Sequence, residues 1–298
     1  MLQVILERGA QALVVMLLIS AMAFSFTHLA GDPVAAMLPL DATQDEVEEL
    51  RRLLDLDKPV WEQYIGFLRR AVVLDFGPSA RYRAPALAVV LDRFPATLVL
   101  AVVSTLLTVL IAMPVGIISA VKRGSLLDKI ATFLIVLGQA IPGFWFGIML
   151  ILLFAVRFGL LPSFGYESYS ALVLPSVTIA LHSSAVVTRL VRTSMLEVIW
   201  KDYVNTARAK GLSEFSVIVC HALRNALIPV VTLLGVQFGA QMGRAVVTET
   251  VFAWPGLGNL MVEAILNQDV ALVQACVIFF TFLITAVNLV VDISYGAI

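Results

Sequence analysis

The segment Tyr203-Val-Asn-Thr-Ala-Arg-Ala-Lys-Gly-Leu212 is polar and basic, and it is followed by His221-Ala-Leu-Arg-Asn-Ala-Leu-Ile-Pro229. Apolar runs long enough to cross a membrane lie on either side. Good helix formers lead up to Gly211, whose backbone permits a sharp turn, and Ser213 and Glu214 can begin a second helix. We therefore expect two short helices joined at Gly211 and held at a membrane surface by the neighbouring spans.

The composition predicts a membrane protein. Hydrophobic residues make up 60% of the chain and charged residues 14%, and the mean hydropathy is +0.96, well above that of soluble domains. The formal net charge of -1 argues against a nucleic-acid-binding protein. Cys220 and Cys276 lack metal-ligand spacing, so we expect free thiols that act as small packing residues.

Six apolar segments reach the length of about 20 residues that a spanning helix needs. They predict an all-α, polytopic membrane protein with six transmembrane helices, organised as one transmembrane domain over residues 1–298. The first segment lacks a small-residue cleavage pattern, so we expect it to be a retained span. The predicted spans are 9–30, 96–121, 129–157, 171–194, 228–250 and 271–294.

Lys and Arg in the short connections predict the orientation of the spans. Lys122 and Arg123 lie in one connection, and the loop at residues 195–227 is also basic, which places both connections in the cytoplasm. The connections at 158–170 and 251–270 contain no Lys or Arg and are expected outside. With six spans, both termini are then cytoplasmic.

The long connection at residues 31–95 is expected to be an external insertion built from short amphipathic helices. Thr43 and Glu46 have the spacing of a capping box at the start of the first helix. Trp61 and Tyr64 begin a second run of apolar residues at helical spacing. The insertion could be a platform for an external partner or a cap over the ends of the spans.

The sequence contains no catalytic or nucleotide-binding motif. His28, His182 and His221 lie in different spans or loops, and neither His-Glu-x-x-His nor Gly-x-Ser-x-Gly occurs. A phosphate-binding Gly-x-x-x-x-Gly-Lys-Ser/Thr run is also missing. We therefore expect that the chain is not an enzyme and has no catalytic, metal or cofactor site. If ATP drives it, another subunit binds the ATP.

Motifs along nearly the whole chain resemble those of one family. Asn205-Thr-Ala-Arg-Ala-Lys-Gly211, with His221, Leu223 and Pro229 downstream, is similar to the cytoplasmic EAA loop of ABC importer permeases, in the variant of the dipeptide/oligopeptide/nickel class. The general consensus has Glu and Ala where this chain has Asn205 and Thr206, a substitution that is usual in the peptide class. Further similar motifs, in the same order, are Gly31-Asp-Pro33, Leu56-Asp-Lys-Pro59, Gln63-Tyr64, Arg93-Phe-Pro-Ala-Thr97, Glu249-Thr-Val-Phe-Ala-Trp-Pro-Gly-Leu-Gly258 and Asn288-Leu-Val-Val-Asp292.

This resemblance implies a type I ABC importer permease in the bacterial inner membrane, forming half of a translocation pathway. It also implies a heterodimer with a second homologous permease, two ATPase subunits that bind ATP and Mg²⁺, and an external solute-binding protein. We interpret the chain as a permease subunit for the ATP-driven import of peptides or similar small polar solutes. The alternatives are a same-family importer of nickel chelates, glutathione or sugars, and an ion-gradient-driven secondary transporter. The secondary transporter predicts ionisable residues near mid-membrane, and the spans show almost no deep charge.

The loop 195–227 is the predicted site of coupling to the ATPase. Leu212 and Phe215 would be exposed apolar side chains near the turn at Gly211 and could fill a cleft on an ATPase, so that its closure moves the spans. Basic residues would line the edge of this contact. The alternative is an ordinary basic cytoplasmic loop. The predicted coupling residues are Asn205, Thr206, Ala207, Arg208, Lys210, Gly211, Leu212, Phe215, His221 and Arg224.

Four polar residues within the spans are candidates for the translocation path: Gln139, Gln237, Gln241 and Asn288. Intramembrane polar groups face the bundle interior or a wet cavity, because lipid cannot satisfy their hydrogen bonds. Gln237 and Gln241 are four residues apart and share a helix face. These residues could line a translocation pathway or form hydrogen bonds between helices, and the sequence does not decide between the two roles. Pro142, close to Gln139, is expected to kink the third span.

Overall fold

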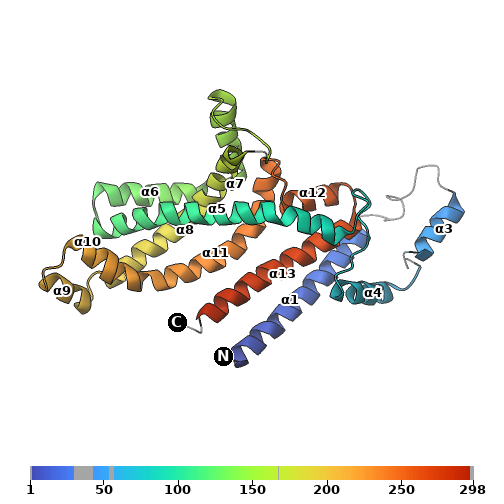
Figure 1. The fold of residues 1–298 in the computed structure, drawn as a ribbon, viewed down its shortest axis with the longest axis horizontal. Helices are drawn as coiled ribbons and strands as arrows, with labels where there is room; N and C mark the ends of the chain where they lie inside the picture. Colours follow the sequence, from blue (N-terminus) through green and yellow to red (C-terminus); the bar gives the residue numbers. More distant parts are fainter. Residues whose placement is uncertain (1, 30–42, 54–56, 167, 296–298) are drawn as a thin grey trace. The chain divides into compact units, whose positions relative to one another are not determined.

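The computed structural model describes residues 2–29, 43–53, 57–166 and 168–295 (Figure 1). Within these ranges the chain is helical, without β-strands, which confirms the all-α prediction. The motif Gly31-Asp-Pro33 and the residue Leu56 lie outside the described residues. The helices are α1 (Leu2–Leu29), α3 (Gln44–Leu53), α4 (Val60–Val72), α5 (Ala86–Val121), α6 (Leu126–Ala140), α7 (Gly143–Leu150), η1 (Ile151–Arg157), η2 (Tyr169–Leu172), α8 (Val173–Val198), α9 (Asp202–Ala209), α10 (Glu214–Ser216), η3 (Val217–Ala222), α11 (Leu223–Val251), α12 (Leu257–Leu266) and α13 (Val270–Tyr295).

Five or six candidate spans correspond to the six that the sequence predicts, and the predicted third span is the one that differs in form. Five helical segments in the described part are long and apolar enough to cross a membrane, and the count is six if the pair of helices bent by 102° between α6 and α7 is one span. We expected a kink at Pro142, and the bend is much larger. Ile141 and Pro142 both have extended backbone, with ψ of 124° and 131°. Proline disfavours helical backbone in the residue before it, so the helix stops and restarts here.

The described chain divides into two compact units, Met1–Thr97 with Pro255–Leu289 and Leu98–Trp254 with Val290–Ile298. In the first unit, the amphipathic helix α4 packs on α1. The ring of Phe24 lies 5.4 Å from that of Tyr64 and 6.0 Å from that of Phe67. The hydroxyls of Ser20 and Tyr64 are hydrogen-bonded at 2.9 Å. These contacts hold one face of α4 against the first span.

The capping box predicted at the start of α3 is confirmed. The backbone N–H of Thr43 donates to Oε2 of Glu46 at 2.8 Å, and the backbone N–H of Glu46 donates to Oγ1 of Thr43 at 3.4 Å. The hydrogen bond from the Thr43 backbone, followed by that from its side chain, lowers the pKa of the Glu46 carboxyl. The first helix of the insertion therefore begins where the sequence pattern places it.

Two distant motifs of the first unit meet at the start of α12. The side-chain oxygen of Thr97 accepts a hydrogen bond of 2.7 Å from the backbone N–H of Leu257. At the other end of α12, the Ser79 hydroxyl donates to Asp269 at 2.5 Å, and Arg81 donates to Asn267 at 2.9 Å. Thr97 of α5 thus contacts the start of α12, and the segment before α5 contacts the residues that follow α12.

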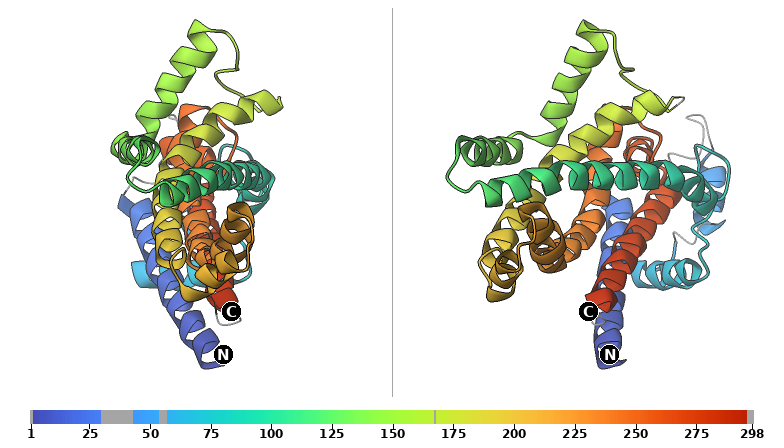
Figure 2. Two further views of the ribbon diagram at one scale, coloured as in Figure 1. Left: turned by 90° about the vertical axis from the view of Figure 1, so that its left-hand side faces the viewer. Right: turned by 60° about the vertical axis from the view of Figure 1, so that its left-hand side comes forward.

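In the second unit, α8 is the central helix and contacts α6, α7 and α11. Figures 1 and 2 show η1 projecting beyond the other helices of this unit, while α9 and α10 connect α8 to α11. The helices α5 and α8 approach closely at Gly116, where an added Cβ would lie 2.7 Å from side-chain atoms of Val191. Small residues at such crossings let membrane helices pack backbone to backbone.

Candidate functional site

The loop 195–227 has the two short helices expected on either side of Gly211. The residue Gly211 has φ of +78°, in the left-handed region that favours glycine. Its N–H donates to the carbonyl of Arg208 at 2.9 Å, and the N–H of Leu212 donates to the carbonyl of Ala207 at 3.4 Å. This pair of bonds is a Schellman motif, which satisfies the last carbonyls of α9 and reverses the chain. The side chain of Ser213 then caps the next helix by accepting from the N–H of Ser216.

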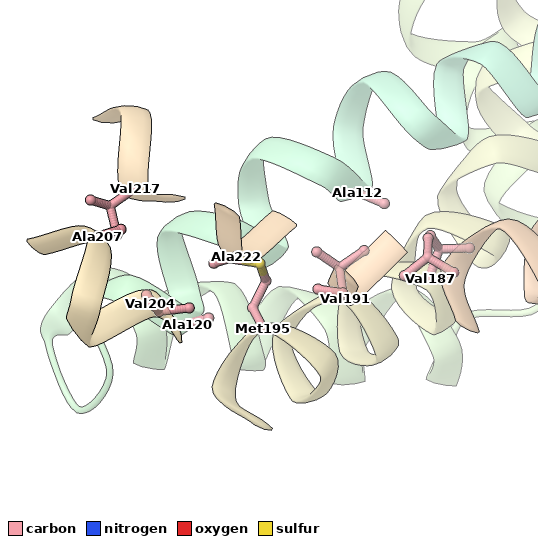
Figure 3. Close-up of a cluster of buried hydrophobic side chains, with 11 residues drawn as sticks. Ala112, Ala120, Val187, Val191, Met195, Val204, Ala207, Val217 and Ala222 are labelled. Atoms are coloured by element: carbon pink, nitrogen blue, oxygen red, sulfur yellow. The ribbon is translucent and has the colours of Figure 1, made fainter. Parts of the chain in front are cut away.

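The inner face of the loop is part of the hydrophobic core of the second unit. Figure 3 shows its side chains lying against α5 and α8, with Val204 and Ala207 from α9 and Val217 and Ala222 from η3. All four are at most 5% exposed. Because protein cores are close-packed, a displacement of this loop must move the helices beneath it. The core residues contributed by the spans include Ala112, Ala120, Val187, Val191 and Met195.

Arg208 connects three parts of the loop. Its Nε donates to Glu214 at 2.9 Å, and its Nη1 donates to the carbonyl of Ile199 at 3.1 Å and to Oδ1 of Asn205 at 3.0 Å. The guanidinium carbon also lies 5.8 Å from the centre of the Trp200 ring. The side chain therefore contacts three parts of the loop, and its place at the edge of a partner contact stays a prediction.

The outer face of the loop exposes apolar side chains. Phe215 is 78% exposed and Leu212 is 42% exposed, beside the turn at Gly211. Trp200 and Tyr203, which the sequence analysis did not select, are 70% and 43% exposed. Aromatic residues within a polar loop were the available signal for them. The other predicted coupling residues divide into exposed Asn205, Thr206, Lys210 and Arg224, half-buried His221 and buried Ala207.

An ionic cluster next to this loop was missed by the sequence analysis. The carboxylate of Asp128, at the start of α6, accepts hydrogen bonds from Nε and Nη2 of Arg192 on α8 at 2.9 and 3.1 Å. The hydroxyl of Ser119 on α5 and the N–H of Gly124 also donate to this carboxylate. The cluster joins three helices at one end of the second unit. A sequence pattern could not pair residues that are 64 positions apart.

The four predicted pathway residues have different surroundings. Gln139 accepts a hydrogen bond of 2.9 Å from Arg189. Gln241 is fully buried and accepts from the Thr105 hydroxyl at 3.4 Å. Gln237 lies partly buried on the same face of α11 as Gln241. Asn288 is exposed on the part of α13 that belongs to the first unit.

Two charged residues inside the predicted fifth span, Arg244 and the fully buried Glu249, were not selected from the sequence. Arg244 lies within α11, between Gln241 and the end of the helix at Val251, and its side chain is partly buried. Its Nε and Nη2 atoms are closed off from solvent and have no hydrogen-bond partner among the residues that the structure describes. The apolar average of the run concealed these charged residues in the sequence.

Comparison with known sequences identifies the family. The profile of the family described as "Binding-protein-dependent transport system inner membrane component" matches residues 112–298, and the N-terminal profile of the same transport systems matches residues 1–101. The chain belongs to this family. The family match and the relatives described below show that the chain is a permease subunit of an ABC importer of the dipeptide/oligopeptide class, as the motifs suggested.

Two curated relatives of this permease cover its whole length. The glutathione transport system permease protein GsiC of Escherichia coli (strain K12) is 38% identical over 299 residues, covering 100% of this chain and 98% of the relative. The dipeptide transport system permease protein DppB of the same strain is 36% identical over 331 residues, with the same coverage. The permease is accordingly a multi-pass inner membrane protein and a transport subunit, with the ATPase on separate subunits.

Solved structures support the type I importer fold. An amino acid ABC transporter crystallised with histidines matches with a TM-score of 0.57 at 13% identity, covering 71% of this chain and 94% of that chain. The MetNI methionine ABC transporter in inward-facing conformations also has a TM-score of 0.57, at 19% identity, covering 70% and 95%. An importer permease of this family works in general with a partner permease, ATPase subunits and a binding protein.

Proposed function

We propose that this permease forms half of the pathway of an importer for small peptides or peptide-like solutes, and that its loop 195–227 docks into a cleft of an ATPase subunit. The observation that carries the docking proposal is the two-sided loop. Phe215 and Leu212 project from the outer face, while Val204 and Ala207 are buried in the core with α5 and α8. A force applied to the outer face would therefore be transmitted to the spans.

The names of the relatives support the solute class. GsiC is described as part of a glutathione transport system and DppB as part of a dipeptide transport system. Both solutes are short peptides with free carboxylates. We propose a solute of this chemistry, delivered by an external binding protein to a pathway shared with a second, homologous permease.

The remaining parts of the proposal concern orientation and energy supply. The basic residues of the loop 195–227, among them Lys201, Lys210 and Arg224, support a cytoplasmic location for the loop and for both termini. Two ATPase subunits would bind ATP and Mg²⁺, and this chain would bind neither. Closure of the ATPases around ATP would then open the pathway to the outside, and ATP hydrolysis would reset the permease to its starting conformation.

Transport by the complete complex tests this function. The complex is reconstituted in vesicles with ATP on the ATPase side and binding protein on the other, and uptake of labelled dialanine and of glutathione is measured. We expect accumulation of at least one peptide that requires ATP. Uptake that follows an imposed ion gradient and ignores ATP, or no ATP-dependent uptake of either peptide, would overturn the proposal.

A further inference from the structure

A polar stripe runs along one face of α11 within the second unit. Gln237, Gln241, Arg244 and Thr248 follow each other at intervals of four, three and four residues, which places them on one side of a helix. Gln241 and Thr248 are buried, and the other two are partly buried. The stripe is therefore enclosed by neighbouring helices over part of its length.

At Gln241 this stripe faces α5. Gln241 is bonded to Thr105 on α5 at 3.4 Å, and α11 packs against α8. The Nε and Nη2 atoms of Arg244 are closed off from solvent. The guanidinium group of Arg244 therefore lies on the side of α11 that is packed against the other helices.

Three donor atoms of this stripe lack acceptors among the residues that the structure describes. Nε and Nη2 of Arg244 and Nε2 of Gln241 are closed off from solvent and have no hydrogen-bond partner within the described part of the chain. The same is true of the hydroxyl oxygens of Ser183 and Ser184 on α8. A buried donor without an acceptor is destabilising, and a buried charge without a counter-charge is more so. Such groups are rare in folded proteins and call for an explanation.

The chemistry of these donors selects an anion with planar oxygens. The guanidinium group presents parallel N–H donors that match the two oxygens of a carboxylate, and the Gln241 amide adds a further donor nearby. We propose that Arg244 and Gln241 bind a carboxylate of the transported solute inside the translocation path. In this conformation the site is closed, and the solute would reach it when α8 and α11 separate. This inference rests on the proposed function, since it assumes a peptide-like solute.

A carboxylate could come from the solute or from an acidic side chain of the partner permease. The burial of the Arg244 atoms favours the solute. Nε and Nη2 are enclosed by residues of this chain itself, so they do not point to an outer surface that a second subunit could cover. A group that is sealed in one conformation and accessible in another is suited to a solute that passes through.

The test compares each solute with its amide. Uptake of dialanine and of its C-terminal amide, and of glutathione and its glycine amide, is measured with the complete complex containing wild-type permease, Arg244→Gln or Arg244→Lys. The binding protein discriminates between acid and amide equally in all complexes, so it cancels when acid-to-amide ratios are compared. We expect the ratio to fall at least about tenfold in Arg244→Gln, the size of a lost hydrogen bond to a charged group, and less in Arg244→Lys.

The matched control is Arg157→Gln, which removes an exposed arginine at the end of η1 and should leave the ratio unchanged. Gln241→Leu should lower the acid-to-amide uptake ratio without removing a charge. This variant tests carboxylate binding if the Arg244→Gln complex does not assemble. An unchanged ratio in assembled Arg244→Lys and Gln241→Leu complexes would overturn the inference while ATP-driven uptake persists. The inference would also be overturned if the Arg244→Gln permease failed to co-assemble with the partner permease while the acid-to-amide uptake ratio stayed unchanged in the other variants. Absence of ATP-dependent uptake in the wild type would instead overturn the proposed function, and the inference with it.

Discussion

The guanidinium group of Arg192 donates two hydrogen bonds to the carboxylate of Asp128, at 2.9 and 3.1 Å, and so fastens α8 to the start of α6. The side chains are 28% and 8% exposed. Removing one partner leaves a largely buried charge without compensation, which typically costs about 3 kcal/mol or more. We therefore expect Asp128→Ala to lower the free energy of unfolding by about this amount, as measured by titration of the permease with SDS in mixed micelles.

The pair Arg52 and Glu48 provides the control for this prediction. Their atoms are 3.7 Å apart, and both side chains are at least 73% exposed. Exposed pairs of this kind contribute little, so Arg52→Ala should leave the unfolding midpoint unchanged. In the double variant Asp128→Ala/Arg192→Ala, the loss should be smaller than the sum of the two single losses. Strict additivity would show that the two side chains do not stabilise each other.

Replacing Gly211 tests the shape of the loop. A β-branched residue at φ of +78° is strained, so Gly211→Val should open the turn after α9 and weaken co-purification of the ATPase with the permease at least severalfold. Gly159 also has positive φ, of +61°, and lies in a connection that we expect on the other side of the membrane. Gly159→Val should introduce similar strain and leave ATPase binding intact. Equal losses in the two variants would point to misfolding and not to docking.

Phe215 is expected to supply binding energy to the ATPase. Because its side chain is 78% exposed, Phe215→Ala should leave permease stability unchanged. If the side chain fills a pocket on the ATPase, its loss should raise the Kd of that complex roughly 30-fold, for a contact worth about 2 kcal/mol. Tyr169 is 97% exposed in a different connection, and Tyr169→Ala is the matched control. Equal Kd values for wild type and Phe215→Ala would contradict the docking proposal.

Close packing of α11 on the end of α13 makes Gly235 sensitive to a single methyl group. A Cβ at this position would lie 2.4 Å from Cγ2 of Val291, so Gly235→Ala should destabilise the permease by about 1 to 3 kcal/mol. Removing the obstacle with Val291→Ala should restore most of the loss. Gly243, on the same helix, has nothing within 4 Å of its added Cβ, and Gly243→Ala should be tolerated. SDS titration distinguishes these outcomes, and an undisturbed Gly235→Ala would refute the close contact.

An alkaline transition is expected from Tyr82, which lies before α5. Burial, followed by the negative charge of Glu263, raises the pKa of the Tyr82 phenol above its ordinary value, and its hydroxyl donates to that carboxylate at 3.2 Å. A raised pKa means that the folded state favours the neutral phenol. The resulting stability is fully present below the ordinary phenol pKa, near 10, and is lost as the pH rises through the folded pKa. The unfolding midpoint should therefore depend less on pH above about 10 in Tyr82→Phe than in the wild type; parallel profiles would exclude this role.

The spans could be predicted from the sequence because each is a long apolar run, and their boundaries were less accessible. The helix α5 begins at Ala86, whereas the predicted span begins at residue 96. Its first turns contain Asp92 and Arg93, which interrupt the apolar pattern but not the helix. The bend after α6 was underestimated, since a proline signals a kink without stating its angle.

The turn at Gly211 was predictable because the left-handed position after a helix strongly favours glycine. The roles of Arg208 and Arg244 were not predictable in the same way. Each depends on which groups the fold brings near it: Arg208 finds Glu214 and the carbonyl of Ile199, and Arg244 finds buried surroundings without an acceptor. Charge and spacing in the sequence identify such side chains and leave their partners open.

The two faces of the loop 195–227 are subject to different constraints. The inner face consists of small side chains such as Ala207 and Ala222, whose replacement by larger ones would disturb the core. The outer side chain of Phe215 is 78% exposed, so it can be replaced without disturbing the core, and Leu212, at 42%, is less exposed. On the proposed docking, replacement of a few outer residues should change which ATPase the permease binds, while the inner residues keep the core unchanged.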